Sequence, residues 1–182
     1  MLFKFFRQPA IDPLQVSMTG VRMGERFLLV GCDDAVLLAG LGAKVGLSGT
    51  AAALVFDDHQ AVRARSAAAR EGFLIEQKIW RGESTGFDAD GFDLVVVDDT
   101  QGGFAGRDAA VRAAVLGEAR RLLRKGGRAE VVEGLGSTGL FAKPTPRPAG
   151  YDTTGELTAA GFAPVRVLAE LPNFRFVEGL RL

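Results

Sequence analysis

Residues 26–34 read Arg26-Phe27-Leu28-Leu29-Val30-Gly31-Cys32-Asp33-Asp34, and the apolar run 35–41 follows at once. Four apolar residues in a row without polar alternation are typical of a central strand of a parallel sheet that is covered on both faces. Gly31 provides a tight turn, and Asp33 or Asp34 can cap a helix that starts immediately. A strand, a glycine turn and a helix N-terminus form the usual cradle for a nucleotide-like ligand in open α/β sheets.

The remainder of the chain alternates between strand and helix patterns. Further strands are predicted at residues 50–56, 73–80, 92–99, 129–133, 165–169 and 174–180, and helices at 34–44, 59–70, 108–124 and 153–161. The strand at 73–80 alternates apolar and polar residues, as a half-exposed strand near a sheet edge does. The last two strands are close enough to pair as an antiparallel hairpin. This order predicts a three-layer α/β sandwich.

The helix ends carry their own signals. Gly46 is expected to cap the first helix, and Gly126-Gly127 is expected to stop the helix that begins at 108. Thr153 with Glu156 predicts a capping box for the last helix.

Length and composition predict one domain. The chain has 182 residues and 47% of them are apolar, which is ample for a sizeable core. Residues 1–25 show no strong period and predict an N-terminal arm, and residues 26–182 predict a single α/β domain. No internal repeat or linker divides them.

Charge and ligand-forming residues exclude several function classes. The 22 basic residues balance the 22 acidic ones, so no overall field points to nucleic acid or to an anionic membrane. Cys32 is the only cysteine, which excludes a disulfide within the chain and is typical of a reducing compartment. His59 is the only histidine, so no metal site is predicted.

The N-terminal arm is rich in aromatic residues. Phe3, Phe5 and Phe6 are interrupted by Lys4 and followed by Arg7, which makes the apolar run too short for a signal peptide or a membrane span. We therefore expect a cytoplasmic protein without an integral membrane segment. The aromatic side chains are expected to pack on their own domain or on a second copy, which predicts a homo-oligomer formed through the arm.

Three phrases in the second half of the chain carry a family resemblance. They are residues 92–97 (Phe-Asp-Leu-Val-Val-Val), residues 122–128 (Leu-Leu-Arg-Lys-Gly-Gly-Arg) and residues 157–162 (Leu-Thr-Ala-Ala-Gly-Phe). With the element order, they resemble the class I S-adenosylmethionine-dependent methyltransferases. The resemblance implies a Rossmann-like, mostly parallel seven-stranded sheet with an antiparallel last strand. It also implies that S-adenosylmethionine lies over the carboxyl ends of the first four strands.

The cofactor turn departs from the family pattern. The family's first strand usually ends in an acidic residue followed by Gly-x-Gly-x-Gly, whereas this chain has Leu29 and then Gly31-Cys32-Asp33-Asp34-Ala35. Glycines at such a turn allow close backbone approach to the ligand and positive φ. Asp33 and Asp34 either bind the ammonium of the methionine moiety, repel its carboxylate, or serve only as helix caps.

Other site residues follow from the resemblance. Asp57 matches the carboxylate that accepts both ribose hydroxyls, although it or Asp58 can instead cap the next helix. Glu83 is the nearest carboxylate after the third strand, and Asp98 matches a position that lines the methyl-transfer pocket. The full set of expected cofactor-binding residues is Gly31, Cys32, Asp33, Asp57, Asp58, Glu83 and Asp98.

The resemblance implies an S-adenosylmethionine-dependent methyltransferase that acts on a small molecule. Methyl transfer depends mostly on proximity and orientation, so it needs no fixed base, and no catalytic residue can be named. The incomplete glycine turn keeps a second hypothesis open, a non-catalytic methyltransferase-like protein that serves as a binding or assembly module. A nicotinamide-dependent dehydrogenase is disfavoured because Gly-x-Gly-x-x-Gly is missing after the first strand.

Overall fold

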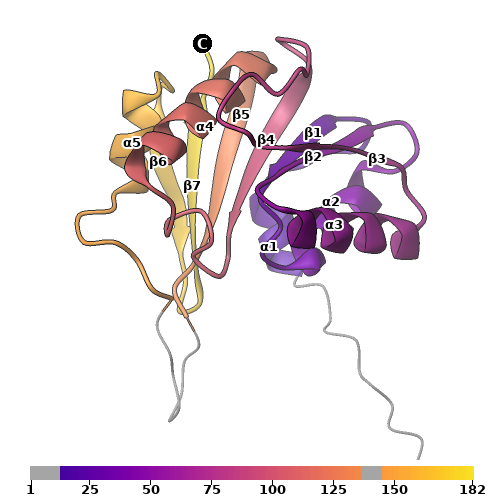
Figure 1. The fold of residues 1–182 in the computed structure, drawn as a ribbon, viewed down its shortest axis with the longest axis horizontal. Helices are drawn as coiled ribbons and strands as arrows, with labels where there is room; N and C mark the ends of the chain where they lie inside the picture. The colour runs from indigo at the N-terminus through magenta and orange to yellow at the C-terminus, as the bar shows by residue number, and fades with distance from the viewer. Residues whose placement is uncertain (1–12, 137–144) are drawn as a thin grey trace, which may run out of the picture.

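A computed structural model describes residues 13–136 and 145–182 of the chain. Its centre is a seven-stranded sheet in the order β3-β2-β1-β4-β5-β7-β6 (Figure 1). The strands are β1 (Arg26–Val30), β2 (Thr50–Val55), β3 (Ile75–Ile79), β4 (Phe92–Asp99), β5 (Leu123–Gly134), β6 (Val165–Glu170) and β7 (Phe174–Leu180). β1 to β5 are parallel, and β7 is antiparallel to both of its neighbours, β5 and β6. The predicted fold class and the terminal hairpin are confirmed.

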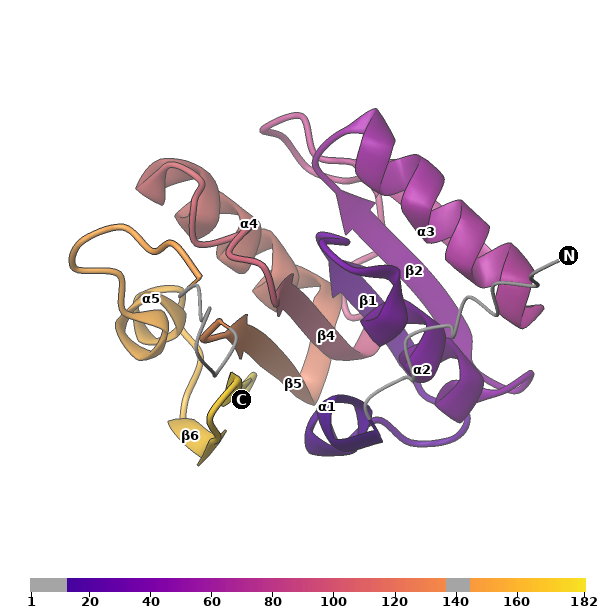
Figure 2. The same ribbon diagram turned by 90° about the horizontal axis from the view of Figure 1, so that it is seen from below.

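Helices cover both faces of the sheet (Figure 2). They are α1 (Pro13–Met18), α2 (Ala35–Val45), α3 (Asp58–Glu71), α4 (Ala109–Leu122) and α5 (Thr153–Ala159). The apolar residues of α1, α2 and α3 form one core, and those of α4 and α5 form a second core on the other side of the sheet. β1 contributes to both, because Phe27 and Leu29 pack in the first core while Leu28 and Val30 pack in the second. The uninterrupted apolar run of β1 therefore reflects burial on both faces.

The ends of α2 form as predicted. Asp34 is the N-cap, and its side chain accepts a hydrogen bond from the backbone N–H of Val36 at 3.0 Å. Gly46 caps the C-terminus with φ of +68°, a conformation that glycine adopts without strain.

The end of α4 corrects one prediction. The helix ends at Leu122, and β5 begins at Leu123 rather than at residue 129. Leu123 is already extended and pairs with Phe92 of β4. After a register shift, the next paired residue of β4 is Leu94, which lies opposite Arg128. The residues between form an irregular stretch of the strand, in which Gly126 takes φ of +72°. The two glycines thus serve this irregularity and do not stop the helix.

The cap of α5 corrects a second prediction. Asp152, not Thr153, is the N-cap, and its carboxylate accepts hydrogen bonds from the N–H groups of Thr154 and Gly155 at 3.1 Å each. The Thr153 hydroxyl instead donates to the buried carboxylate of Glu133 on β5. The predicted capping box does not form, because the Thr153 side chain is hydrogen-bonded to Glu133.

The described part of the predicted arm packs into the domain. Val16 of α1 and Val21 after it are buried in the core beside α2. Arg128 of β5 donates to the carbonyl oxygen of Gly20 at 2.6 Å and pairs with Glu25. The phenylalanines at positions 3, 5 and 6 lie outside the described residues, as does the contact predicted for them. Within the described ranges, every helix is too short or too polar to cross a bilayer.

Candidate functional site

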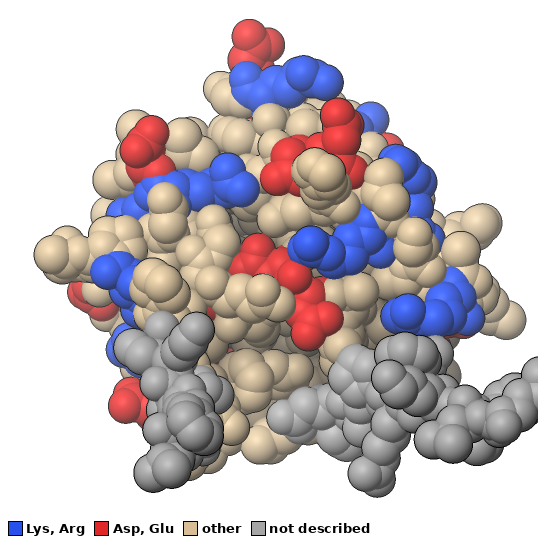
Figure 3. Space-filling model, turned by 60° about the horizontal axis from the view of Figure 1, so that its bottom comes forward, with Lys and Arg blue, Asp and Glu red and all other residues tan. Residues whose placement is uncertain are grey.

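The carboxyl ends of the parallel strands meet at one edge of the sheet. Acidic side chains gather near the middle of this face, and basic side chains surround them (Figure 3). Gly31 bends the chain here with φ of +79°, and its N–H donates to the carbonyl oxygen of Leu54 on β2 at 2.8 Å. A Cβ at this position would lie 3.3 Å from the carbonyl oxygen of Asp98. Glycine is therefore needed because β1 and β4 approach each other closely.

Asp98 ties the end of β4 to this turn. Its side chain is fully buried and accepts hydrogen bonds from the N–H groups of Asp33 at 3.0 Å and Asp34 at 3.3 Å. The N–H and hydroxyl of Thr100 donate to its other oxygen. Burial raises the pKa of Asp98 to about 7, although the hydrogen bonds from Thr100 oppose the rise. Asp98 thus occupies the backbone donors of the turn.

Asp33 holds down the segment 100–107 that follows β4. Its carboxylate accepts the N–H of Gly103 at 2.9 Å and a longer hydrogen bond from the Gln60 side chain at 3.4 Å. A Cβ at residue 103 would overlap the Asp33 carboxylate, so this contact also depends on glycine. Burial raises the pKa of Asp33, against the lowering effect of the Gly103 N–H. Of the two acidic residues in the turn, Asp34 is the helix cap and Asp33 is a tertiary contact.

Asp57 follows β2 and caps α3. Its Oδ1 accepts the N–H of Gln60 at 2.8 Å, and its carbonyl oxygen accepts the N–H of Ala61 at 3.0 Å. Asp58 is the first residue of α3, and both carboxylates are exposed. Gln60 connects Asp57 to Asp33, because its backbone contacts the first and its side chain the second. The predicted ribose acceptor is therefore also an N-cap.

Two arginines complete the site, and the sequence patterns did not single them out. Arg63 of α3 reaches over the turn and donates to the carbonyl oxygens of Cys32 and Asp33, the latter at 2.8 Å. The Arg107 guanidinium lies 3.6 Å from the ring centroid of Phe56 and interacts electrostatically with Asp57 and Asp33. The sequence offered only their positions as a signal: Arg63 lies in the helix that follows the acidic residues after β2, and Arg107 lies in the loop after β4.

Cys32 is buried beneath the turn and points into the core formed with α2 and α3. Burial, followed by the nearby charge of Asp98, raises the pKa of its thiol to about 12. A thiol with so high a pKa is a poor nucleophile at neutral pH. The buried side chain of Cys32 is therefore directed away from the edge where a cofactor is predicted, and only its backbone lies in the turn.

Glu83 lies apart from the other predicted residues. It is exposed in the β3–β4 loop and lines a hollow of about 370 Å³ with Trp80 and Ser84. It also lines a second hollow beside α4. The structure brings Gly31, Asp33, Asp57 and Asp98 together, and no described contact connects Glu83 with them.

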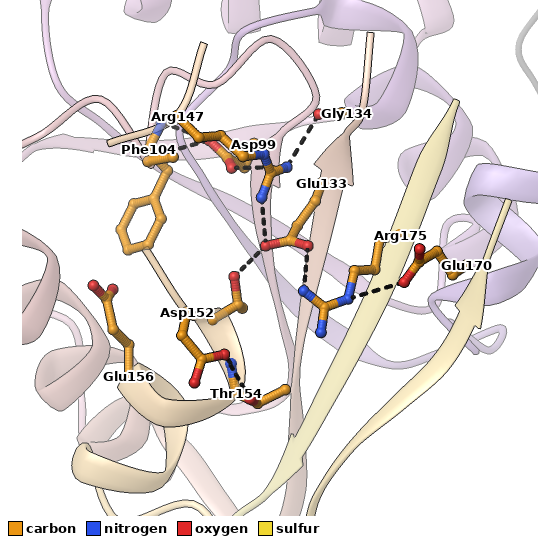
Figure 4. A network of polar contacts seen from close by, with 12 residues as sticks. Asp99, Phe104, Glu133, Gly134, Arg147, Asp152, Thr154, Glu156, Glu170 and Arg175 are labelled. Atoms are coloured by element: carbon orange, nitrogen blue, oxygen red, sulfur yellow. Dashed lines mark hydrogen bonds and ion pairs between the residues drawn. The ribbon is translucent and has the colours of Figure 1, made fainter. Parts of the chain in front are cut away.

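A buried polar network continues the site toward β5 and β7 (Figure 4). Glu133, at the end of β5, is fully buried between two arginines: Arg147 Nη1 lies 2.9 Å from its Oε1, and Arg175 Nη1 lies 3.5 Å from its Oε2. Asp99 accepts the N–H groups of Phe104 at 3.0 Å and Ala105 at 2.8 Å, so it shapes the segment 100–107 from its other end. Burial raises the pKa of Asp99 to about 6.

The arrangement offers two kinds of recognition. Asp57 can accept hydrogen bonds from vicinal hydroxyls, and Arg63 and Arg107 place positive charge beside the acidic turn. Within residues 13–136 and 145–182, no three His, Cys, Asp or Glu side chains are grouped to hold a metal ion.

No family model and no curated protein matches the chain. Solved structures do. A SAM-dependent methyltransferase from Aquifex aeolicus is similar with a TM-score of 0.76 and 18% identity, over 94% of this chain and 90% of that one. The S-adenosylmethionine-dependent methyltransferase SibL is similar with a TM-score of 0.68 and 21% identity, over 94% of this chain and 54% of that one. A SAM-dependent O-methyltransferase from Thermotoga maritima is similar with a TM-score of 0.63 and 16% identity, over 93% of this chain and 63% of that one. Topology and these likenesses agree that the chain has the fold of the class I S-adenosylmethionine-dependent methyltransferases.

Proposed function

We propose that this protein is an S-adenosylmethionine-dependent methyltransferase that acts on a small molecule. The observation that carries the proposal is the position of Asp57. This carboxylate stands at the end of β2, connected through Gln60 to the Gly31 turn, in a sheet with the methyltransferase strand order. A carboxylate there has the acceptor oxygens that a ribose diol requires.

The residues present fit such a cofactor in part. Asp57 suits the ribose of the cofactor. Arg63 and Arg107 suit the methionine carboxylate, because their positive charges offset the acidic residues of the turn. S-adenosylmethionine would supply, when bound, an electrophilic methyl group that an acceptor attacks in line, with S-adenosylhomocysteine as the leaving group. The chain's own contribution is to bind, to orient and to exclude water, which segment 100–107 can do since Asp33 and Asp99 hold it over the sheet.

The acceptor is proposed to be small because the described residues form the core fold with little added to it. Among the described residues, the segment 100–107 follows β4, and Arg147 pairs with Glu133 at the end of β5. A core fold with so little added to it suits a small molecule better than a polymer.

One observation favours a second candidate, a non-catalytic binding or assembly module. The N–H groups of Asp33 and Asp34, which the glycine turn of the family leaves for the ligand, are already bonded to Asp98. For such a module we expect that neither S-adenosylmethionine nor S-adenosylhomocysteine binds.

Isothermal titration calorimetry with both compounds tests the two candidates. We expect the wild type to bind S-adenosylhomocysteine weakly, and Asp57→Ser to lower the affinity by about one to two orders of magnitude, the effect of one charge-assisted hydrogen bond. Serine preserves an N-cap for α3, so a loss of binding would not reflect a damaged helix.

Glu71→Ala provides the matched control, because it removes one carboxylate from the opposite end of the same helix. It should bind as the wild type does. If neither compound gives a heat of binding at high protein concentration, the methyltransferase hypothesis is rejected and the hypothesis of a non-catalytic binding module stands.

A further inference from the structure

The outer edge of β3 is open. β3 pairs with β2 in an unbroken parallel register from Ile75 to Ile79, and no other strand in the described part of the chain pairs with it. A hollow of about 370 Å³ runs beside its second half, from Gln77 to Thr85. Natural proteins usually blunt or cover such an edge, because its free N–H and C=O groups can pair with another strand.

The direction of the free groups can be read from one hydrogen bond. The N–H of Trp80 donates to the carbonyl oxygen of Val55 on β2 at 2.7 Å. Backbone groups of a strand alternate in direction, so the even-numbered residues face β2. The N–H and C=O groups of Ile75, Gln77 and Ile79 therefore face outward.

The sequence of the strand is complementary to itself. Ile75-Glu76-Gln77-Lys78-Ile79, placed antiparallel to a second copy with Gln77 opposite Gln77, sets each Glu76 against the Lys78 of the other copy. Leu74, whose side chain is 94% exposed, then lies opposite Trp80 of the other copy. In this register the outward residues form the hydrogen-bonded pairs, and Glu76 and Lys78 form the non-hydrogen-bonded pairs, in which side chains are closest.

The charged side chains are accessible for this pairing. Within one copy Glu76 and Lys78 are 3.4 Å apart, and their side chains are 60% and 38% exposed. The Gln77 side chain instead contacts α3, where it donates to the carbonyl oxygen of Ala61 and accepts from Arg65. Gln77, which lies opposite Gln77 of the other copy in this register, thus offers only its backbone to the contact.

The opposite edge of the sheet lacks these properties. β6 has a register shift between Val167 and Ala169, and such irregularities hinder pairing with a further strand. Its charged residues are also engaged, Arg166 with Glu178 and Glu170 with Arg175. The self-complementary edge is therefore that of β3.

We propose that two copies of this chain associate through β3, antiparallel about a two-fold axis at Gln77, so that the sheets join edge to edge. The proposal does not depend on methyl transfer. Opposite-charge pairs at both ends of the contact set the register and select a second copy of this chain as the partner.

Charge substitutions test the proposal in sedimentation velocity experiments over a concentration series. The wild type is expected to form a dimer. Glu76→Lys and Lys78→Glu each turn two attractive pairs into repulsive ones and should weaken the dimer by roughly tenfold or more. An equimolar mixture of the two variants should form a heterodimer, and the double variant Glu76→Lys/Lys78→Glu should regain self-association.

Amide hydrogen exchange measured by NMR gives a second readout. The N–H groups of residues 75, 77 and 79 should gain protection as concentration rises, whereas those of 76 and 78 are already bonded to β2. A monomer at all concentrations overturns the proposal. So does association that neither single variant weakens; if removal of residues 1–12 then abolishes it, the contact belongs to the N-terminal segment.

Discussion

At the scale of single residues, Glu130 is a buried acidic side chain without a hydrogen-bond partner among the described residues. It lies on β5, fully buried, opposite Glu178 of β7, and neither of its carboxylate oxygens has a hydrogen-bond partner. Burial, and then the nearby charge of Glu178, raises its pKa from 4.5 to about 8. Burial therefore favours the protonated form of Glu130 in the folded protein.

This burial predicts a pH dependence of stability. The folded-state pKa is raised, so the unfolded state loses its proton first, and the free energy of unfolding should fall as pH rises from about 4.5 to about 8. Glu130→Gln removes the ionisation and should match the wild type near pH 4 while exceeding it by on the order of a few kcal/mol near pH 8. Urea unfolding of both proteins across this range measures the difference. Parallel curves would show that folding does not raise the pKa of Glu130.

At the scale of elements, the turn between β1 and α2 is the part that differs most from the expected pattern. Asp33→Gly with Ala35→Gly restores the glycines of the family motif. It removes the carboxylate that binds the Gly103 N–H and the side chains that limit backbone approach. We expect S-adenosylhomocysteine to bind the double variant about tenfold more tightly, measured by calorimetry, a change of about 1.4 kcal/mol. Tight binding by the wild type that is lost in the variant would instead make Asp33 a ligand contact.

At the scale of the whole molecule, Arg112 joins parts of the chain that are distant in sequence. Its side chain, on α4, is 7% exposed and forms a bidentate pair with Glu156 of α5, with Nη2 2.6 Å from Oε1 and Nε 3.0 Å from Oε2. It also donates to the carbonyl oxygens of Ala105 and Arg107. One guanidinium thus positions α5 and the end of the segment that covers the site.

Arg112→Ala should lower the free energy of unfolding by about 3–5 kcal/mol, because it leaves the Glu156 carboxylate and two carbonyl groups without their donor. Arg124→Ala is the matched control: its pair with Asp93 has a half-exposed arginine and should contribute no more than about 1 kcal/mol. Chemical denaturation measures both. Equal effects of the two substitutions would mean that the Arg112 contacts add little.

Local patterns were sufficient for the elements and for the fold class. The apolar run of β1 and the glycine at 46 act over a few neighbouring residues, so the sequence by itself determined them. It left the helix cap open between Asp33 and Asp34, and the structure decided for Asp34. The alternation at residues 73–80 likewise predicted an edge strand, and β3 is at the edge. The seven-stranded, mostly parallel sheet with its antiparallel last strand followed from the family resemblance.

Tertiary structure alone decided the rest, because the partners are distant in sequence. Asp98 finds the turn N–H groups 65 and 64 residues away, and Asp33 finds Gly103 70 residues away. The same holds for the start of β5, where pairing with Phe92 ends α4 before the glycines, and for Thr153, which Glu133 diverts from capping. Short-range spacing reports which groups need a partner; only the packed sheet brings the partner within hydrogen-bonding distance.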